Sequence, residues 1–166
     1  MEKSKVSLRE PNPKDLDGMY DILENSLSQY LTVNKGSSKN NQLIIDKNDV
    51  KAYVNNDAYL CKIAQIGSDI AGWMAGSCNN KVLSEHRCSS GEFYIEEIVV
   101  ASHYRRKGVG SFLLSIIPLD KLKAIVVDTP LINKQAIAFY EHRGFVKASG
   151  LSEEFSKNWT RMSKSF

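Results

Sequence analysis

The segment Ser102-His-Tyr-Arg-Arg-Lys-Gly-Val-Gly-Ser111 lies between a strong strand pattern over residues 92–101 and a helical pattern that begins at Gly108. Glycines at the start of this helix, Gly108 and Gly110, allow a ligand to approach the backbone closely. The first turn of a helix leaves N–H groups without intrahelical partners, and the helix dipole favours negative charge there. Three consecutive cations precede the turn: Arg105, Arg106 and Lys107. The segment therefore predicts a binding site for phosphate or pyrophosphate.

Two other phosphate-binding motifs do not fit this segment. The dinucleotide fingerprint requires a glycine three residues after the second glycine, where this chain has Leu113. The nucleoside-triphosphate loop requires Gly-Lys-Ser/Thr after a longer spacer, which is absent here. An alternative without any ligand stays open, in which a solvated basic turn precedes the helix and the glycines serve tight packing.

Hydrophobic periodicity and turn residues predict the elements on either side. The predicted helices span residues 16–31, 48–55, 108–117 and 133–143. The predicted strands span residues 5–9, 58–66, 70–77, 92–101, 124–127, 145–149 and 159–162. The continuous apolar run Ala124–Val127 is typical of a strand buried on both faces, and the last two strands are expected to form a hairpin. This order predicts an α/β fold with a mixed sheet, in which the right-handed crossover rule makes strands 92–101 and 124–127 parallel.

Length and composition favour a single domain over residues 1–166, with no linker or repeat. The chain has 22 basic and 19 acidic side chains, a net charge of +3, and this near balance argues against a nucleic-acid binder. Its cysteines, Cys61, Cys78 and Cys88, are odd in number and widely spaced, which predicts no disulfide framework and a cytoplasmic location. No apolar run approaches the roughly 20 residues of a membrane helix, and residues 1–11 lack the apolar core of a signal peptide.

A second motif follows the phosphate-binding turn further along the sequence. Asn133, Ala136, Phe139 and Tyr140 are followed by Gly144-Phe145. Arg105-Arg-Lys-Gly-Val-Gly110 follows a strand that ends in Ile98-Val99-Val100. With both motifs in this order, the chain resembles the GCN5-related N-acetyltransferase (GNAT) superfamily over residues 94–145, while the first third matches only in element order. Two departures are Ser102, where many members have proline, and Pro118, which shortens the helix after the turn.

The resemblance implies a mostly antiparallel mixed sheet with one splayed parallel strand pair and helices on both faces. It implies acetyl-CoA as cosubstrate, with CoA as product, and direct transfer of the acetyl group to a primary amine. The main chain of Ile98, Val99 and Val100 would hold pantetheine and the acetyl carbonyl. The remaining implied cofactor-binding residues are Arg105, Arg106, Lys107, Gly108, Val109, Gly110, Ser111, Asn133, Phe139 and Tyr140.

The chemistry also requires proton transfers. An alkyl amine, with a pKa of about 10.4, arrives protonated and must lose a proton before it attacks. The resemblance makes Glu96 the first candidate base and Glu97 the second, and strand alternation puts the two on opposite faces. Two alternatives stay open. Backbone groups and water alone could remove the proton, or the two carboxylates lie at the surface without a catalytic role. Tyr140 matches the family's general acid, which donates a proton to the leaving thiolate. The alternative is that Tyr140 is only a packed aromatic on a buried helix face.

Several alternatives stay open. The acceptor is a small or polyamine-like amine or a peptide amine, and Tyr30 with loop 32–41 is expected near it by fold analogy. No metal is expected, because His86 and Cys88 fall short of a tetrahedral ligand set. An acetyl-cysteine route lacks an adjacent base motif. A homodimer is an open expectation, and a non-catalytic acyl-CoA-binding module is the alternative function.

Overall fold

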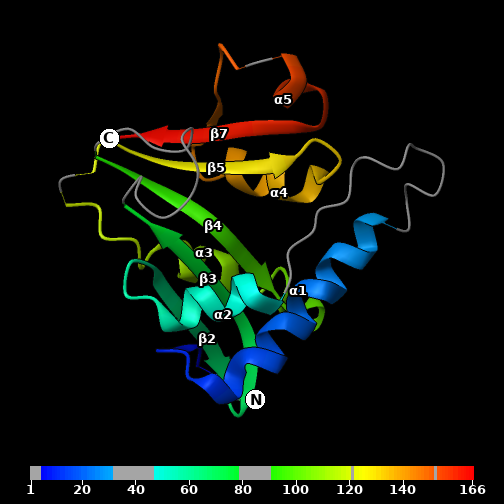
Figure 1. Cartoon of the computed structure of the whole chain (residues 1–166), viewed down its shortest axis with the longest axis vertical. Helices are drawn as coiled ribbons and strands as arrows, with labels where there is room; N and C mark the ends of the chain where they lie inside the picture. Colours follow the sequence, from blue (N-terminus) through cyan, green and yellow to red (C-terminus); the bar gives the residue numbers. More distant parts are fainter. Residues whose placement is uncertain (1–4, 32–46, 79–90, 121, 152) are drawn as a thin grey trace. The chain divides into compact units, whose positions relative to one another are not determined.

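The computed structural model describes residues 5–31, 47–78, 91–120, 122–151 and 153–166 (Figure 1). The loop expected near the acceptor, residues 32–41, lies outside the described residues, as do His86 and Cys88. The side chain of Tyr30 is also outside them. None of the helices in the described ranges is long and apolar enough to cross a membrane.

The described residues form seven strands. These are β1 (Ser7–Arg9), β2 (Leu60–Ile66), β3 (Asp69–Ser77), β4 (Glu92–Val100), β5 (Ala124–Pro130), β6 (Val146–Lys147) and β7 (Trp159–Ser165). Hydrogen bonds join them in the order β1-β2-β3-β4-β5-β7-β6. The β1–β2, β2–β3, β5–β7 and β6–β7 pairs are antiparallel, and β4–β5 is parallel. The predicted α/β fold with a mixed sheet and a parallel β4–β5 pair is confirmed.

The helices of the described ranges largely follow the predicted periodicity. They are α1 (Leu16–Leu31), α2 (Lys47–Asn55), α3 (Val109–Leu114), α4 (Lys134–Glu141) and α5 (Glu153–Asn158), with 3-10 turns η1 (Pro13–Asp15) and η3 (Ser102–Tyr104). The apolar stripe of α1 buries Met19 and Leu23, as its spacing predicts. The predicted turn at Gly67 joins β2 to β3, and Gly67 has a φ of 61°.

Helix α3 is shorter than predicted, because it ends at Leu114 rather than near Pro118. After it, the amides of Ile116 and Ile117 bond to carbonyls three residues back, at 3.3 and 3.4 Å. The Ser115 hydroxyl donates to the Phe112 carbonyl at 2.7 Å. A serine that bonds its own backbone competes with the helix ladder, and a residue before proline is kept from helical geometry. Both effects favour ending α3 at Leu114 and replacing its last predicted turn with bonds to carbonyls three residues back.

The hairpin predicted from the last two strands is present, with Val146 opposite Ser163. The connection between its strands contains α5, which the sequence reading missed. A helix of six residues is too short to display a helical period clearly. The missed helix changes the length of the connection but not the pairing.

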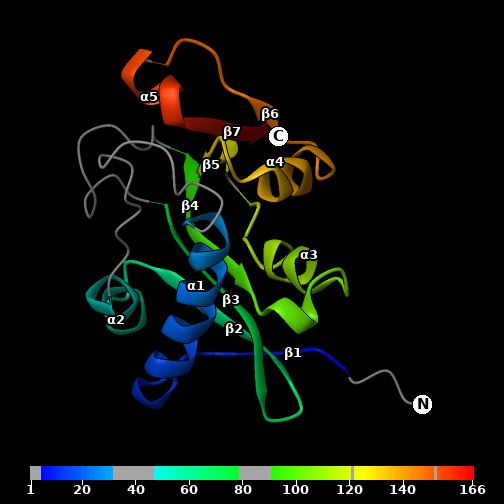
Figure 2. The same ribbon diagram turned by 90° about the vertical axis from the view of Figure 1, so that its right-hand side faces the viewer.

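Contacts between residues divide the chain into two compact units that both include part of β4. The first unit contains residues 1–76 and 97–117. In it, the indole of Trp73 donates to the Met19 carbonyl at 3.0 Å, which places α1 on one face of β3. The adjacent Gly72 faces Val109 of α3, so helices cover both faces of these strands (Figure 2).

The second unit contains residues 77–96 and 118–166. Its centre is β5, whose residues 124–127 are all buried, as predicted. On one side β5 pairs with β4, from Glu92 opposite Ala124 to Ile95 opposite Val127, and on the other it pairs with β7. The prediction of one domain over residues 1–166 stays a prediction.

Candidate active site

The turn between β4 and α3 has the backbone geometry that its glycines predict. Arg106 has a φ of 62° and Gly108, the residue before α3, has a φ of 87°. The first hydrogen bond of the helix runs from the Phe112 amide to the Gly108 carbonyl, at 2.9 Å. The amides of Val109 and Gly110 precede that bond, in the positions where the first turn of a helix presents N–H groups to a ligand. The turn therefore offers backbone donors to an anion.

The three cations of the turn are placed differently from one another. Arg105 donates from Nε to the Val100 carbonyl at 3.1 Å and from a terminal nitrogen to the Ser26 hydroxyl at 3.3 Å. Arg106 and Lys107 are exposed, and the Lys107 ammonium lies 5.4 Å from the ring centre of Tyr104. Arg105 thus links the end of β4 to α1, whereas Arg106 and Lys107 put positive charge at the surface of the turn.

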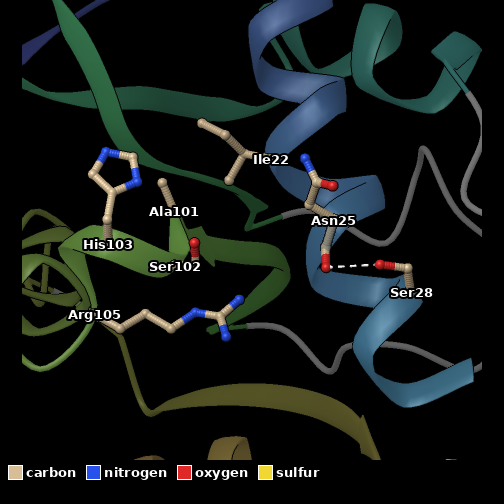
Figure 3. A pocket seen from close by; sticks show the side chains of 7 residues that line it. All are labelled: Ile22, Asn25, Ser28, Ala101, Ser102, His103 and Arg105. Atoms are coloured by element: carbon tan, nitrogen blue, oxygen red, sulfur yellow. Dashed lines mark hydrogen bonds between the residues drawn. The ribbon is translucent and has the colours of Figure 1, made fainter. Parts of the chain in front are cut away.

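A cavity of about 430 Å³ lies beside this turn within the first unit (Figure 3). Figure 3 shows side chains from α1 facing those of the segment 101–105 across it. The lining residues are Ile22, Asn25, Ser28, Ala101, Ser102, His103 and Arg105. The sequence reading missed the α1 residues, although Asn25 and Ser28 are three positions apart and so share one face of the helix. The lining combines hydroxyl, amide, imidazole and guanidinium groups with the apolar side chains of Ile22 and Ala101.

Gly72 of β3 lies directly against the end of β4. A Cβ atom there would be 2.5 Å from the Val99 carbonyl oxygen and 3.2 Å from the Val100 Cα. The Ala101 amide also donates to the Ala71 carbonyl at 3.0 Å. Only glycine permits this approach, so Gly72 sets the path of the segment Ile98–Val100. The sole sequence signal for it was a glycine inside an apolar strand pattern.

Gly72→Ala is expected to destabilise the fold by about 1–3 kcal/mol, because the added methyl group meets rigid backbone rather than a side chain that can move. Urea unfolding followed by circular dichroism measures this change. Gly18→Ala is the matched control, since its new methyl group would meet only the flexible end of Ile70, at 3.2 Å. The control should be neutral or slightly stabilising, because alanine favours helix. Equal stabilities of Gly72→Ala and the parent chain would contradict the close approach.

The candidate bases lie where the β4–β5 ladder stops. The last pair is Ile95 with Val127, so Glu96 is the first residue of β4 beyond it. Glu96, Glu97 and Ile98 are all partly exposed, whereas Val99 is buried. Glu96 belongs to the second unit and Glu97 to the first. Which of them acts as the base stays a prediction.

Helix α4 carries the candidate acid. Tyr140 is 3% exposed, and its ring centre lies 5.3 Å from those of both Phe139 and Phe145. The Asn133 side chain accepts a hydrogen bond from the Ala136 amide at 2.9 Å, so it caps the N-terminus of α4. The packing of Tyr140 fits both its catalytic and its structural interpretation. The capping bond gives Asn133, the first residue of the second motif, a structural role as well.

The cysteines of the described ranges are free thiols, at Cys61 and Cys78. Burial raises the pKa of the Cys61 thiol to about 12, and it also raises the pKa of Cys78. A thiol that stays protonated near neutral pH is a poor nucleophile. These two residues therefore do not favour an acetyl-cysteine route. The described parts of the chain hold no group of three or more residues suited to a metal ion.

A family model described as "Acetyltransferase (GNAT) family" matches residues 19–145. Among curated proteins, N-alpha-acetyltransferase 30 of Xenopus laevis is 30% identical over 99 residues, which is 57% of this chain and 34% of that protein. The human protein of the same name is 29% identical over 99 residues, 57% of this chain and 26% of that protein. The chain spans about a third or less of the length of these relatives.

Solved structures share the fold at low identity. The PaiA N-acetyltransferase of Thermoplasma acidophilum, in complex with coenzyme A, has a TM-score of 0.72 and 14% identity, with 98% of this chain and 99% of that chain covered. Ard1 of Thermoplasma volcanium has a TM-score of 0.68 and 21% identity, with 96% and 97% covered. At such identities the likeness concerns the fold alone.

Proposed function

Because the chain belongs to the acetyltransferase (GNAT) family, we propose that it transfers the acetyl group of acetyl-CoA directly to a primary amine. The observation that supports this most is the turn between β4 and α3. There the amides of Val109 and Gly110 precede the first hydrogen bond of the helix, and Arg106 and Lys107 add exposed positive charge. Such a turn suits the pyrophosphate of a CoA thioester.

The cosubstrate is held mainly by backbone. The amides of residues 106–111 bind the pyrophosphate, and the main chain of Ile98, Val99 and Val100 binds pantetheine and the acetyl carbonyl. Arg105 supports the turn through Val100 and Ser26 rather than by its charge alone. Asn133 and Phe139 contact the cosubstrate arm. When bound, acetyl-CoA supplies the activated acetyl group.

The chain's residues then move two protons. Glu96, directly or through water, removes a proton from the ammonium form of the acceptor, and the nitrogen attacks the acetyl carbonyl. A backbone N–H of β4 stabilises the negative charge that develops on the carbonyl oxygen. Once the carbon–nitrogen bond has formed, the tetrahedral intermediate collapses, the carbon–sulfur bond breaks and the nitrogen loses its second proton to water. Tyr140 donates a proton to the departing thiolate and recovers one from solvent. Glu97 is the second candidate for the base.

The acceptor we favour is the α-amine of a peptide. The curated relatives are named N-alpha-acetyltransferases, which supports a peptide N-terminus over a polyamine-like amine. The two free thiols among the described cysteines support the cytoplasmic location expected from the sequence. A non-catalytic acyl-CoA-binding module is the alternative function, and it would bind the thioester without consuming it.

The test has two stages. Calorimetric titration with acetyl-CoA, with CoA and NADH as controls, should give micromolar affinity for acetyl-CoA and no binding of NADH. Release of CoA thiol is then measured with four acceptors: a peptide with a free N-terminus, an N-blocked peptide containing lysine, a polyamine and a free amino acid. Thiol release with the first peptide supports the proposal. Binding without release supports the binding module, and a folded chain that binds no acetyl-CoA rules out both.

A further inference from the structure

A hydroxyl–carboxylate pair joins the β2–β3 hairpin to the chain just before the phosphate-binding turn, residues 105–110. The Tyr104 hydroxyl donates to Oδ2 of Asp69 at 2.8 Å, across 35 positions of sequence. Both residues belong to the first unit. Asp69 is the first residue of β3, and Tyr104 is the last residue of η3. The pair therefore ties the start of the turn to a distant part of the chain.

The hairpin itself holds Asp69 in place. Its strands pair as far as Ile66 and Asp69, so only Gly67 and Ser68 lie between them. Gly67 has a φ of 61°, the left-handed conformation that a tight two-residue turn requires. The Ser68 hydroxyl donates to Oδ1 of Asp69 at 3.3 Å. One carboxylate oxygen thus has a partner within the hairpin, and the other accepts from Tyr104.

The turn has a backbone conformation that needs outside support. Arg106 has a φ of 62°, and a residue other than glycine keeps this left-handed conformation only where its surroundings hold it. Before Arg106, the Ala101 amide donates to the Ala71 carbonyl at 3.0 Å. Ala71 is two residues after Asp69 in β3. The same strand therefore holds the segment at two points, through Ala101 and through Tyr104.

The ring of Tyr104 also places a cation of the turn. The Lys107 ammonium lies 5.4 Å from the ring centre, within the range of a cation–π contact. The hydrogen bond to Asp69 raises the pKa of Tyr104 above its ordinary value, so the hydroxyl remains a donor at neutral pH. The ring that contacts Lys107 is therefore itself held by the hairpin.

We propose that Asp69 and Tyr104 are positioning residues for acetyl-CoA, which hold the phosphate-binding turn in its ligand-binding conformation before the ligand arrives. The inference rests on the proposed function. A site whose donors are already in place loses less conformational freedom on binding and so binds more tightly. Because the pair acts through the turn, its loss should weaken cosubstrate binding without slowing the chemical step.

Calorimetry and thiol-release kinetics of Asp69→Ala and Tyr104→Phe test this on the full chain. Each variant loses the hydroxyl–carboxylate bond, and each should raise the Kd and the KM of acetyl-CoA about 3- to 10-fold. The kcat and the amine KM should stay within about twofold of the parent values, a split that a general loss of folded structure would not give. The double variant should bind no more weakly than either single variant, because all three lack the same bond. Asp69→Asn keeps an oxygen that can accept from Tyr104, so it should restore most of the affinity.

Hydrogen exchange without ligand provides a readout that does not depend on activity. The Tyr104 amide donates to the Ala101 carbonyl at 2.8 Å, and the Arg105 amide donates to the Ser102 carbonyl at 3.3 Å. If the pair holds this segment, local opening becomes easier without it, and both amides should exchange about 3- to 10-fold faster in the two single variants.

Asp17→Ala is the matched control. It removes another exposed carboxylate contact of the first unit, the ion pair of Asp17 with Lys47 at 2.6 Å. Its acetyl-CoA affinity and its exchange rates should equal those of the parent chain. Unchanged acetyl-CoA affinity in folded Asp69→Ala and Tyr104→Phe would overturn the inference, as would a loss of kcat as large as the loss of affinity. A parent chain that binds no acetyl-CoA overturns the proposed function, and the exchange rates then still decide whether the pair holds the turn.

Discussion

Gly110→Arg is expected to abolish the binding of acetyl-CoA, so that a calorimetric titration detects no heat at millimolar ligand. Gly110 is the second residue of α3, and its amide precedes the first hydrogen bond of the helix. A long side chain at this position would occupy the space in which a pyrophosphate must approach the backbone. The added positive charge would not compensate, because in the proposed site several amides hold the ligand at short range.

Ser115→Arg is the control for Gly110→Arg. It adds the same side chain one residue after the end of α3, at an exposed position. The control should bind acetyl-CoA with the affinity of the parent chain, and both variants should show the parent's circular dichroism. Micromolar binding by folded Gly110→Arg would mean that the ligand does not lie at this turn.

Tyr140→Phe is expected to reduce kcat about 10²–10⁴-fold, the usual contribution of a positioned proton donor. The ring packs against Phe139 and Phe145, and phenylalanine keeps those contacts. Folding and acetyl-CoA affinity should therefore change little. Substrate positioning, which can contribute about 7–11 kcal/mol, is retained, so measurable transfer should remain. Thiol release at saturating amine gives kcat, and calorimetry gives the affinity.

The same chemical change elsewhere provides the comparison. Tyr53 of α2 is 9% exposed, and its ring centre lies 5.0 Å from that of Tyr59. Tyr53→Phe removes a hydroxyl from a buried aromatic cluster in the other unit, and kcat should stay at the parent value. A Tyr140→Phe enzyme with full kcat would leave the tyrosine as a packing residue only.

Local sequence patterns predicted the elements that carry a clear period or a clear turn. The helix 16–31, the buried run Ala124–Val127 and the turn at Gly108 all agree with the structure, because each depends on neighbouring residues. The end of α3 and the helix α5 were mispredicted. In α3 a serine and a following proline override the apolar stripe, and α5 is too short to display one.

Features that depend on distant residues could not be predicted in this way. Asp128 and Arg161 are 33 positions apart in the chain, and they became partners only once the register of β5 and β7 was known. The need for glycine at position 72 could not be predicted either, because it depends on the close approach of β4 to β3. The predicted phosphate-binding turn was identifiable because the donors of such a site are consecutive amides, whereas the Asp128–Arg161 pair joins two strands.

Arg105 opens the turn's signature in the sequence, yet its guanidinium holds the Val100 carbonyl and the Ser26 hydroxyl. A residue such as Arg105 can thus belong to a ligand-binding signature without binding the ligand, because it holds in place the backbone whose amides are the donors. Selection at such a position acts on a pair of residues rather than on one. Among relatives, residues 26 and 105 should therefore covary, with glutamine or arginine at 105 matched by the length of the side chain on α1, while the glycines of the turn vary independently of both.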